Sequence, residues 1–223
     1  TSVCGLFLAP GKIHPLIAII AIFATSLGAG ASGCLNMWYE SDSDSLMTRT
    51  KNRPLPAGRI ARDTALSFGM ILAIGSVLMM AVCINYVAAV FLAFTLFFYV
   101  VVYTMWLKPH TPYNIVWGGL AGALPPLIGW SAVTKTEDLP PLIMLAIIFF
   151  WTVPHFWSLA LLKAKDYENA NIPMLPNTHG IIHTKKQIVL YTVLTILCPL
   201  LLLGCGFNSF YFVLLSLPLG GMF

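Results

Sequence analysis

Charged side chains are scarce in this sequence, and their scarcity excludes an ordinary soluble fold. Asp, Glu, Lys and Arg make up 9% of the 223 residues, whereas soluble domains carry about 25%. Hydrophobic residues reach 58%, and the mean hydropathy is +0.85. Such a composition is typical of a chain that spans a lipid bilayer as helices, because a spanning helix forms its backbone hydrogen bonds internally. We therefore predict an all-α polytopic membrane protein.

The cysteines lack the spacing of a metal site or of a disulfide framework. All five lie in or beside apolar runs, where small side chains fill the packing between helices: Cys4, Cys34, Cys83, Cys198 and Cys205. The net charge of +4 does not indicate nucleic-acid binding, because the cations stand in short loops between apolar segments. We expect membrane lipid around the protein and no nucleic acid.

The sequence also lacks an initial methionine and the basic start of a cleavable signal peptide. It begins at Thr1 and stops at Phe223 inside an apolar run. We therefore expect a single transmembrane domain over residues 1–223, with material missing at both ends.

Apolar stretches of the length needed to cross a bilayer, roughly 20 residues each, follow one another along the chain. About seven such helices are predicted, over 13–35, 64–84, 87–107, 115–133, 139–162, 188–206 and 209–223. Lys and Arg gather in alternate loops, which by the positive-inside rule face the cytoplasm. In a bacterial plasma membrane these loops face the cytoplasm, and in the mitochondrial inner membrane they face the matrix.

Two of the loops on this side, 36–63 and 163–187, are long and polar. Function concentrates on loops that a rigid scaffold positions. Because four crossings separate the two loops, they can face each other over one cavity. We interpret them as the two halves of one site.

The first loop opens with three oxygen-bearing side chains at regular spacing. If the first long helix continues past Leu35, Asn36, Glu40 and Asp44 fall at i, i+4 and i+8 and share one face. Oxygen ligands suit Mg²⁺, which is commonly held by one or two carboxylates together with substrate phosphates. The spacing predicts a metal-bridged diphosphate site. The alternative is a solvated charged loop, which acidic runs usually form.

Three cations follow in the same loop. Arg49 and Arg53 are also at i and i+4, and their planar guanidinium groups bind phosphate oxygens in pairs. Lys51 is counted with them as a phosphate-binding residue. The alternative role of all three is to anchor the loop on the positive side of the membrane, and Lys51 fits that role better.

In the second loop, Asp166, Tyr167 and Glu168 are candidates to complete the metal and phosphate shell from the opposite side. The prolines of the following segment, 172–176, predict an extended connection. His155 lies inside a predicted span, which favours haem binding or proton handling, although a hydrogen-bonded structural histidine fits equally well.

Small residues precede the first loop and recur in a later span. Gly28, Gly30 and Gly33 belong to the first run, and Gly118, Gly119 and Gly122 to the second. Small side chains let helix backbones approach closely in lipid, so we expect these residues to serve helix packing.

Several of these motifs resemble those of one protein family. Asn36-x3-Glu40-x3-Asp44 with the following Arg49-Thr-Lys-Asn-Arg53 is similar to the first aspartate-rich motif of the UbiA-type intramembrane prenyltransferases, in the form found in the subfamily that farnesylates haem. Pro154-His-Phe-Trp157 and the segment 166–176 resemble that subfamily's second motif. Glu40 stands where the first motif of the family usually has Asp. In the second motif, Ala170 stands where quinone-pathway relatives usually have a second Asp.

The resemblance implies a bundle of nine transmembrane helices around a central cavity, with about seven to eight present in this chain. It implies that Asn36, Glu40, Asp44 and Asp166 hold Mg²⁺, that Arg49, Arg53, Lys51 and Tyr167 bind diphosphate, and that His155 is a weaker candidate for haem. The implied reaction transfers farnesyl from farnesyl diphosphate to a vinyl group of haem B, giving haem O for terminal oxidase biogenesis. A downstream haem A synthase is the implied partner.

Two alternatives remain open at this point. A relative in the same family, acting on a quinone precursor or a chlorophyll-like ring, shares the first motif. A transporter or non-catalytic membrane subunit would use the charged loops as an ion path or a docking surface.

Overall fold

The computed structural model describes residues 1–136 and 138–203, and this part of the chain is built of helices. In chain order the helices are α1 (Ser2–Leu8), α2 (Pro15–Tyr39), α3 (Ser41–Leu46), α4 (Arg62–Cys83), α5 (Tyr86–Phe97), the π-helix η1 (Phe98–Leu107), α6 (Lys108–His110), α7 (Asn114–Ala123), α8 (Pro125–Thr134), α9 (Leu139–Leu162), α10 (Ala164–Asn169) and α11 (Leu175–Leu203). The predicted all-α membrane fold is confirmed.

Six stretches of the described chain are long and apolar enough to cross a membrane: Pro15–Tyr39, Arg62–Cys83, Tyr86–His110, Asn114–Thr134, Leu139–Leu162 and Leu175–Leu201. Five of them match predicted spans. The sixth begins at Leu175 rather than at residue 188, so the second polar loop is shorter than expected. Pro176 is the second residue of α11, and the first turn of a helix tolerates proline because its N–H groups have no partner within the helix. The predicted span 209–223 lies outside the described residues.

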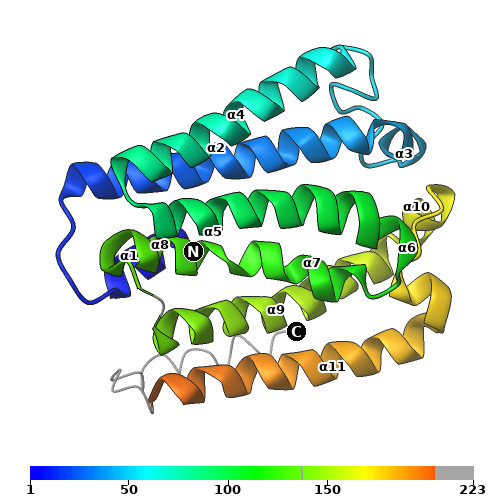
Figure 1. The fold of residues 1–223 in the computed structure, drawn as a ribbon. Coiled ribbons are helices and arrows are strands. Elements are labelled where there is room, and N and C mark those ends of the chain that lie inside the picture. The colour runs from blue at the N-terminus through cyan, green and yellow to red at the C-terminus, as the bar shows by residue number, and fades with distance from the viewer. Residues whose placement is uncertain (137, 204–223) are drawn as a thin grey trace.

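The long helices lie side by side in one bundle (Figure 1). α2 packs against α4, α5 lies beneath them, and α9 packs against both α7 and α11. The short helices α3, α6 and α10 gather at one end of the bundle, while α1 packs against α8 toward the other. The polar segments predicted to form one site therefore lie at the same end.

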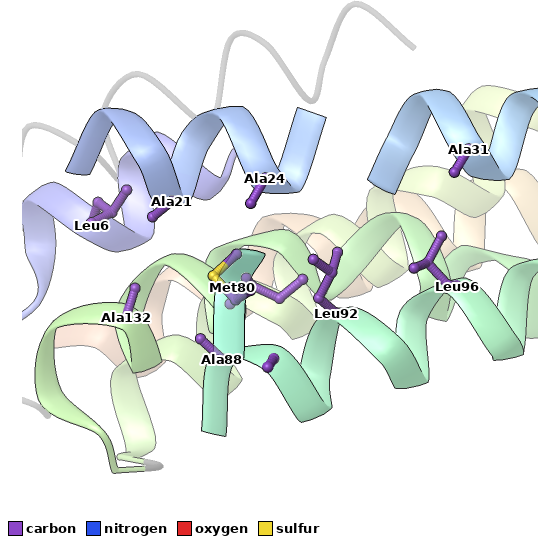
Figure 2. Close-up of a cluster of buried hydrophobic side chains, with 11 residues drawn as sticks. Leu6, Ala21, Ala24, Ala31, Met80, Ala88, Leu92, Leu96 and Ala132 are labelled. Atoms are coloured by element: carbon purple, nitrogen blue, oxygen red, sulfur yellow. The ribbon is translucent and has the colours of Figure 1, made fainter. Parts of the chain in front are cut away.

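A core rich in alanine joins α2, α4, α5 and α8 (Figure 2). Its buried residues are Leu6, Ala21, Ala24, Ala31, Met80, Ala88, Ala89, Leu92, Leu96, Ile128 and Ala132. Small side chains on facing helices allow their backbones to approach closely in lipid, where packing drives helix association. This cluster, which we call the alanine core, fixes α2 against α5.

Proline divides one predicted span. The apolar stretch 114–134 forms two helices, because Pro125 has no N–H to continue the hydrogen bonding of α7 and instead begins α8. The Pro125-Pro126 pair thus divides this membrane-spanning stretch into two helices.

Candidate functional site

The acidic end of α2 keeps its three oxygen-bearing side chains in line. The first long helix continues past Leu35, as the spacing argument required, but α2 ends at Tyr39 and Glu40 has a non-helical ψ of 8° before α3 begins at Ser41. The hydrogen bonding nevertheless stays in phase: the Glu40 N–H donates to the Asn36 carbonyl at 2.9 Å, and the Asp44 N–H donates to the Glu40 carbonyl at 2.8 Å. The three side chains lie on one wall, and all three residues are buried.

This wall bounds a cavity of about 480 Å³ between the helices. Its polar lining includes Asn36, Glu40 and Asp44, the cations Arg49, Arg53 and Lys108, and the phenols of Tyr99, Tyr103 and Tyr167, together with Thr1 and Thr152. Its other sides are mostly apolar and come chiefly from α7 and α9, with Ile115, Gly118, Gly119, Gly122, Ile148, Trp151 and Phe156. The cavity thus combines a charged end with an apolar wall, as ligand sites commonly do.

Each buried carboxylate of the cavity already has a cation. Arg53 donates from Nη1 to Asp44 Oδ2 at 2.7 Å, and Lys108 Nζ lies 2.5 Å from Glu40 Oε1. The side chains of Glu40 and Lys108 are only 9% and 16% exposed. A buried charge without a partner is strongly destabilising, so this pairing allows the charges to stay in the bundle.

Lys108 is the cavity residue that the sequence interpretation missed. In the sequence, Lys108 is one of several loop cations that the positive-inside rule explains. In the structure it directly follows the π-helix and lines the cavity. Tyr99 and Tyr103 were also passed over. The available signal was their i, i+4 spacing with each other and the five-residue step from Tyr103 to Lys108, all at the polar end of one span.

The π-helix η1 orients the amide of Asn36. Thr104 donates its hydroxyl proton to the carbonyl of Tyr99, five residues earlier, at 2.8 Å, and its oxygen accepts from Asn36 Nδ2 at 3.2 Å. With Nδ2 engaged in this way, the carbonyl oxygen of the amide stays available as an acceptor or ligand. π-Helical turns are rare and often occur at functional sites.

The second polar segment meets the first at two places. The Thr48 hydroxyl donates to Asp166 Oδ1 at 2.8 Å, and Arg49 and Tyr167 line the same cavity, where the charge of Arg49 acts on the Tyr167 hydroxyl. Burial raises the pKa of Tyr167 above its usual range, while the charge of Arg49 opposes this shift. The two predicted halves of the site therefore meet, as their placement at one end of the bundle requires.

The structure does not bring every candidate residue into the cavity. Asp166, His155, Lys51 and Glu168 are not among the residues that line it. The ring of His155 stacks on that of Trp151, with centroids 4.7 Å apart. Within the described ranges, no three side chains of His, Cys, Asp or Glu form a cluster able to hold a metal by themselves.

Comparison with known proteins identifies the family. The model of the UbiA prenyltransferase family matches residues 1–223, the entire chain. The chain belongs to the UbiA prenyltransferase family. It is therefore a prenyltransferase, and the resemblance inferred from the two motifs is confirmed.

Relatives within the UbiA family are close in sequence. The chain is 53% identical to the protoheme IX farnesyltransferase of Rhizobium leguminosarum bv. trifolii (strain WSM2304), over 100% of this chain and 71% of that protein. It is 51% identical to the protoheme IX farnesyltransferase of Ehrlichia ruminantium (strain Gardel), over 100% of this chain and 76% of that protein.

Solved UbiA structures share the fold. A UbiA homolog from Archaeoglobus fulgidus, bound to DMAPP and Mg²⁺, superposes with a TM-score of 0.74 at 15% identity and covers 98% of this chain and 76% of its own. The same homolog bound to GPP and Mg²⁺ gives the same TM-score at 16% identity. The UbiA-type bundle around a central cavity, predicted from the sequence, is confirmed.

Proposed function

We propose that this protein transfers the farnesyl group of farnesyl diphosphate to a vinyl group of haem B and so makes haem O. The proposal rests on one observation: two buried carboxylates, three cations and an apolar wall meet in the same cavity. The relatives named protoheme IX farnesyltransferase, 51–53% identical over the whole chain, support this choice of donor and acceptor.

In the proposed reaction the bond between the first farnesyl carbon and the diphosphate oxygen breaks, and the bonding electron pair leaves with diphosphate. The terminal vinyl carbon of haem B then bonds to the allylic cation. Water captures the positive charge left beside the porphyrin ring and loses a proton, which gives the hydroxyl of haem O. The net change consumes farnesyl diphosphate, haem B and water and releases diphosphate with a proton.

The cations of the cavity stabilise the negative charge that develops on the departing diphosphate. Arg49, Arg53 and Lys108 line the same end of the cavity, and fixed positive groups aimed at developing charge are among the largest contributions to catalysis. The apolar wall limits the access of water to the allylic cation before the vinyl carbon attacks.

The donor set of the charged wall fits Mg²⁺. Glu40 and Asp44 supply buried carboxylates and Asn36 an amide oxygen, and Mg²⁺ needs only one or two carboxylates when substrate phosphates complete its shell. We propose that these three residues hold the metal, with Asp166 supporting the loop through Thr48. Bound Mg²⁺ would neutralise the diphosphate and make it a better leaving group.

The acceptor ring is proposed to lie on the apolar wall formed by α7 and α9. Trp151 and Phe156 line the cavity from α9, and Gly118 and Gly119 line it from α7. Aromatic faces beside small residues suit a flat ring. Trp157, the next residue in the chain, does not line the cavity and is fully buried in an apolar cluster with Val153 and Leu175.

We also propose that the end of the bundle bearing α3, α6 and α10 faces the cytoplasm, or the matrix in a mitochondrial membrane. The cations Arg49, Arg53, Arg59, Arg62 and Lys108 occur in or beside these segments, and short basic loops stay on that side. The charged diphosphate group of farnesyl diphosphate would then enter the cavity from the aqueous phase on that side.

The direct test supplies purified protein with haem B, farnesyl diphosphate and Mg²⁺ and measures haem O by chromatography and mass spectrometry. We expect haem O to form and to require all three additions. Parallel reactions replace haem B with a quinone precursor or with a chlorophyll-like ring. Prenylation of one of these rings without haem O would overturn the proposed acceptor while leaving prenyl transfer intact.

Tyr167→Phe is expected to lower kcat/KM for farnesyl diphosphate at least about tenfold, because a hydrogen bond from the phenol to the charged diphosphate is worth about 1.5–3 kcal/mol. Since the pKa of Tyr167 is raised from 10, its phenol stays protonated below pH 10 and can donate to the diphosphate. The pH profiles of the wild type and the variant should therefore run parallel between pH 6 and pH 9. An unchanged kcat/KM would remove Tyr167 from the site.

A further inference from the structure

One stripe of α9 lines the charged cavity at helical spacing. Ile148, Thr152 and Phe156 stand at i, i+4 and i+8 on this helix, and all three line the cavity. Trp151 and His155 belong to the neighbouring stripe of the same helix, which packs against α7 and α11 (Figure 1). Trp151 lines the cavity as well, but His155 is not among the lining residues. His155 therefore lies beside the lining rather than in it.

The His155 ring contacts two aromatic rings of the cavity lining. It stacks on the Trp151 indole, with centroids 4.7 Å apart and planes inclined by 14°. Its centroid lies 5.2 Å from that of Phe156, in an edge-to-face arrangement at 81°. The contact with Trp151 joins side chains at i and i+4, which are neighbours on a helix surface. His155 thus lies behind two of the rings that form the acceptor wall.

The stack on Trp151 restricts an indole that is only partly packed. Trp151 is 39% exposed, and a partly exposed side chain keeps rotational freedom that it must lose when a ligand binds. A ring stacked in parallel on one face of the indole narrows the orientations that the indole can adopt. Fixing a binding group in advance in this way increases affinity, because less freedom is lost on binding.

The same geometry opposes the haem ligation that the sequence suggested for His155. An axial ligand directs a ring nitrogen at the iron, and the iron of an acceptor bound in the cavity would lie inside the lining. His155 lies outside that lining and turns one face of its ring to Trp151. Its effect on a bound flat ring must then pass through the indole.

We propose that His155 is a positioning residue, which holds the Trp151 indole as a platform for the flat acceptor ring and does not coordinate the haem iron. This role rests on the proposed function, since it concerns the acceptor of the same reaction. Aromatic stacking contributes binding energy beyond the area that it buries. The acceptor should therefore bind more tightly while the stack between His155 and Trp151 is intact.

Substitutions of His155 separate stacking from ligation in a titration of the purified protein with haem B. His155→Phe keeps a ring that can stack but has no nitrogen, so the Kd should stay within about twofold of the wild type and the absorption spectrum of bound haem should not change. His155→Ala and His155→Gln lose the ring, and each should raise the Kd about threefold to tenfold, the range that one aromatic pair is worth. The Kd of farnesyl diphosphate should not change in any of the three.

A double-mutant cycle shows whether His155 acts through the indole. Trp151→Ala removes the platform and should raise the Kd of haem B at least about tenfold. Adding His155→Ala to that variant should cause no further loss, because the residue through which His155 acts is gone. An iron ligand would instead lose the same factor in both backgrounds.

Two matched controls lie outside the cavity lining. Trp117→Ala removes an indole that is 56% exposed on α7, and His110→Ala removes an exposed imidazole whose ring nitrogen bonds the Trp106 carbonyl at 2.6 Å. Both should leave the Kd of haem B unchanged. Thermal unfolding checks the fold of every variant, and His155→Leu, which fills the space without a ring, replaces His155→Ala if that variant unfolds.

Three results would overturn the positioning role. A shifted spectrum with lost affinity in His155→Phe would make His155 an iron ligand. Normal affinity in His155→Gln with lost affinity in His155→Phe would replace the stack by a hydrogen bond. Equal losses from His155→Ala with and without Trp151, or no loss in any folded His155 variant, would leave the indole without a need for its neighbour.

Failure of the positioning role can be told from failure of the proposed reaction. Haem B binding that depends jointly on His155 and Trp151, without haem O from the wild type, would overturn the reaction and leave the positioning role standing. Haem O formation with additive losses in the cycle would overturn the positioning role alone. If the wild type prenylates another flat ring, the cycle is measured with that ring, and the same coupling is expected.

Discussion

Asp44→Asn is expected to reduce haem O formation at least about a hundredfold. Asp44 is buried at 4% exposure, lines the cavity and accepts a hydrogen bond from Arg53 at 2.7 Å. Asparagine keeps the shape of the side chain but loses the charge that we propose to bind Mg²⁺ and that pairs with Arg53, and loss of one such electrostatic contact typically costs 10²–10³ in kcat. The measurement is the steady-state rate of haem O formation at saturating Mg²⁺.

Asp42→Asn is the matched control for this prediction. Asp42 lies on α3 two residues before Asp44, but its side chain is 87% exposed and pairs with Arg62 at the surface. Exposed ion pairs contribute little, so this variant should keep the wild-type rate within about twofold. Equal rates for both variants, whether high or low, would separate Asp44 from the chemistry.

Lys108→Met is expected to lower both the activity, by about a hundredfold or more, and the thermal stability of the protein. The substitution removes a cation from the diphosphate end of the cavity and leaves the buried Glu40 carboxylate without its partner. Breaking a fully buried pair costs about 3–5 kcal/mol, and the 16% exposure of Lys108 places it near the lower end. Lys185→Met, at an exposed position of α11, should change neither quantity.

A second variant separates the two effects of Lys108. The double substitution Glu40→Gln with Lys108→Met removes both charges, so it should recover most of the thermal stability while the activity stays low. Recovery of activity along with stability would show that Lys108 acts only as a partner for Glu40. The two melting temperatures and the two rates, taken as a double-mutant cycle, decide between these roles.

The sequence predicted the charged wall well because its signal is local. The spacing of Asn36, Glu40 and Asp44 depends only on helical hydrogen bonding, which persists across the irregular backbone at Glu40. The predicted meeting of the two polar segments was also correct, because positive loops on alternate turns of a membrane chain must lie on one side.

Lys108 escaped prediction as a cavity residue because its position depends on packing between distant segments. Lys108 reaches Glu40 only because α2 lies beside η1, 68 residues away in sequence. Gly28 and Gly33 look alike in the sequence, yet one packs against Leu92 and the other faces open space. Sequence spacing gives the face of a helix but not the neighbour that covers it.

The start of α11 shows a different limit. Prolines and polar side chains in the segment 172–187 favoured a long loop, but after the turn at Asn171 only Ile172 to Met174 lie outside a helix before α11 begins at Leu175. Pro176 fits the first turn, and Gly180 takes a left-handed φ of 83° inside the helical stretch. Among common residues glycine alone adopts a positive φ without strain. Together with a ψ of 166°, it interrupts the helical backbone, so two helices meet at a kink within α11.

The pairing of the cavity charges also bears on how the newly synthesised chain inserts into the membrane and assembles. Until substrate arrives, Glu40 is matched by Lys108 and Asp44 by Arg53, so the newly made bundle places two neutral pairs, rather than four isolated charges, at the edge of the hydrocarbon. Isolated charges in that setting oppose insertion and assembly. The cations that we propose to stabilise the departing diphosphate thus serve first as internal counterions of the buried carboxylates.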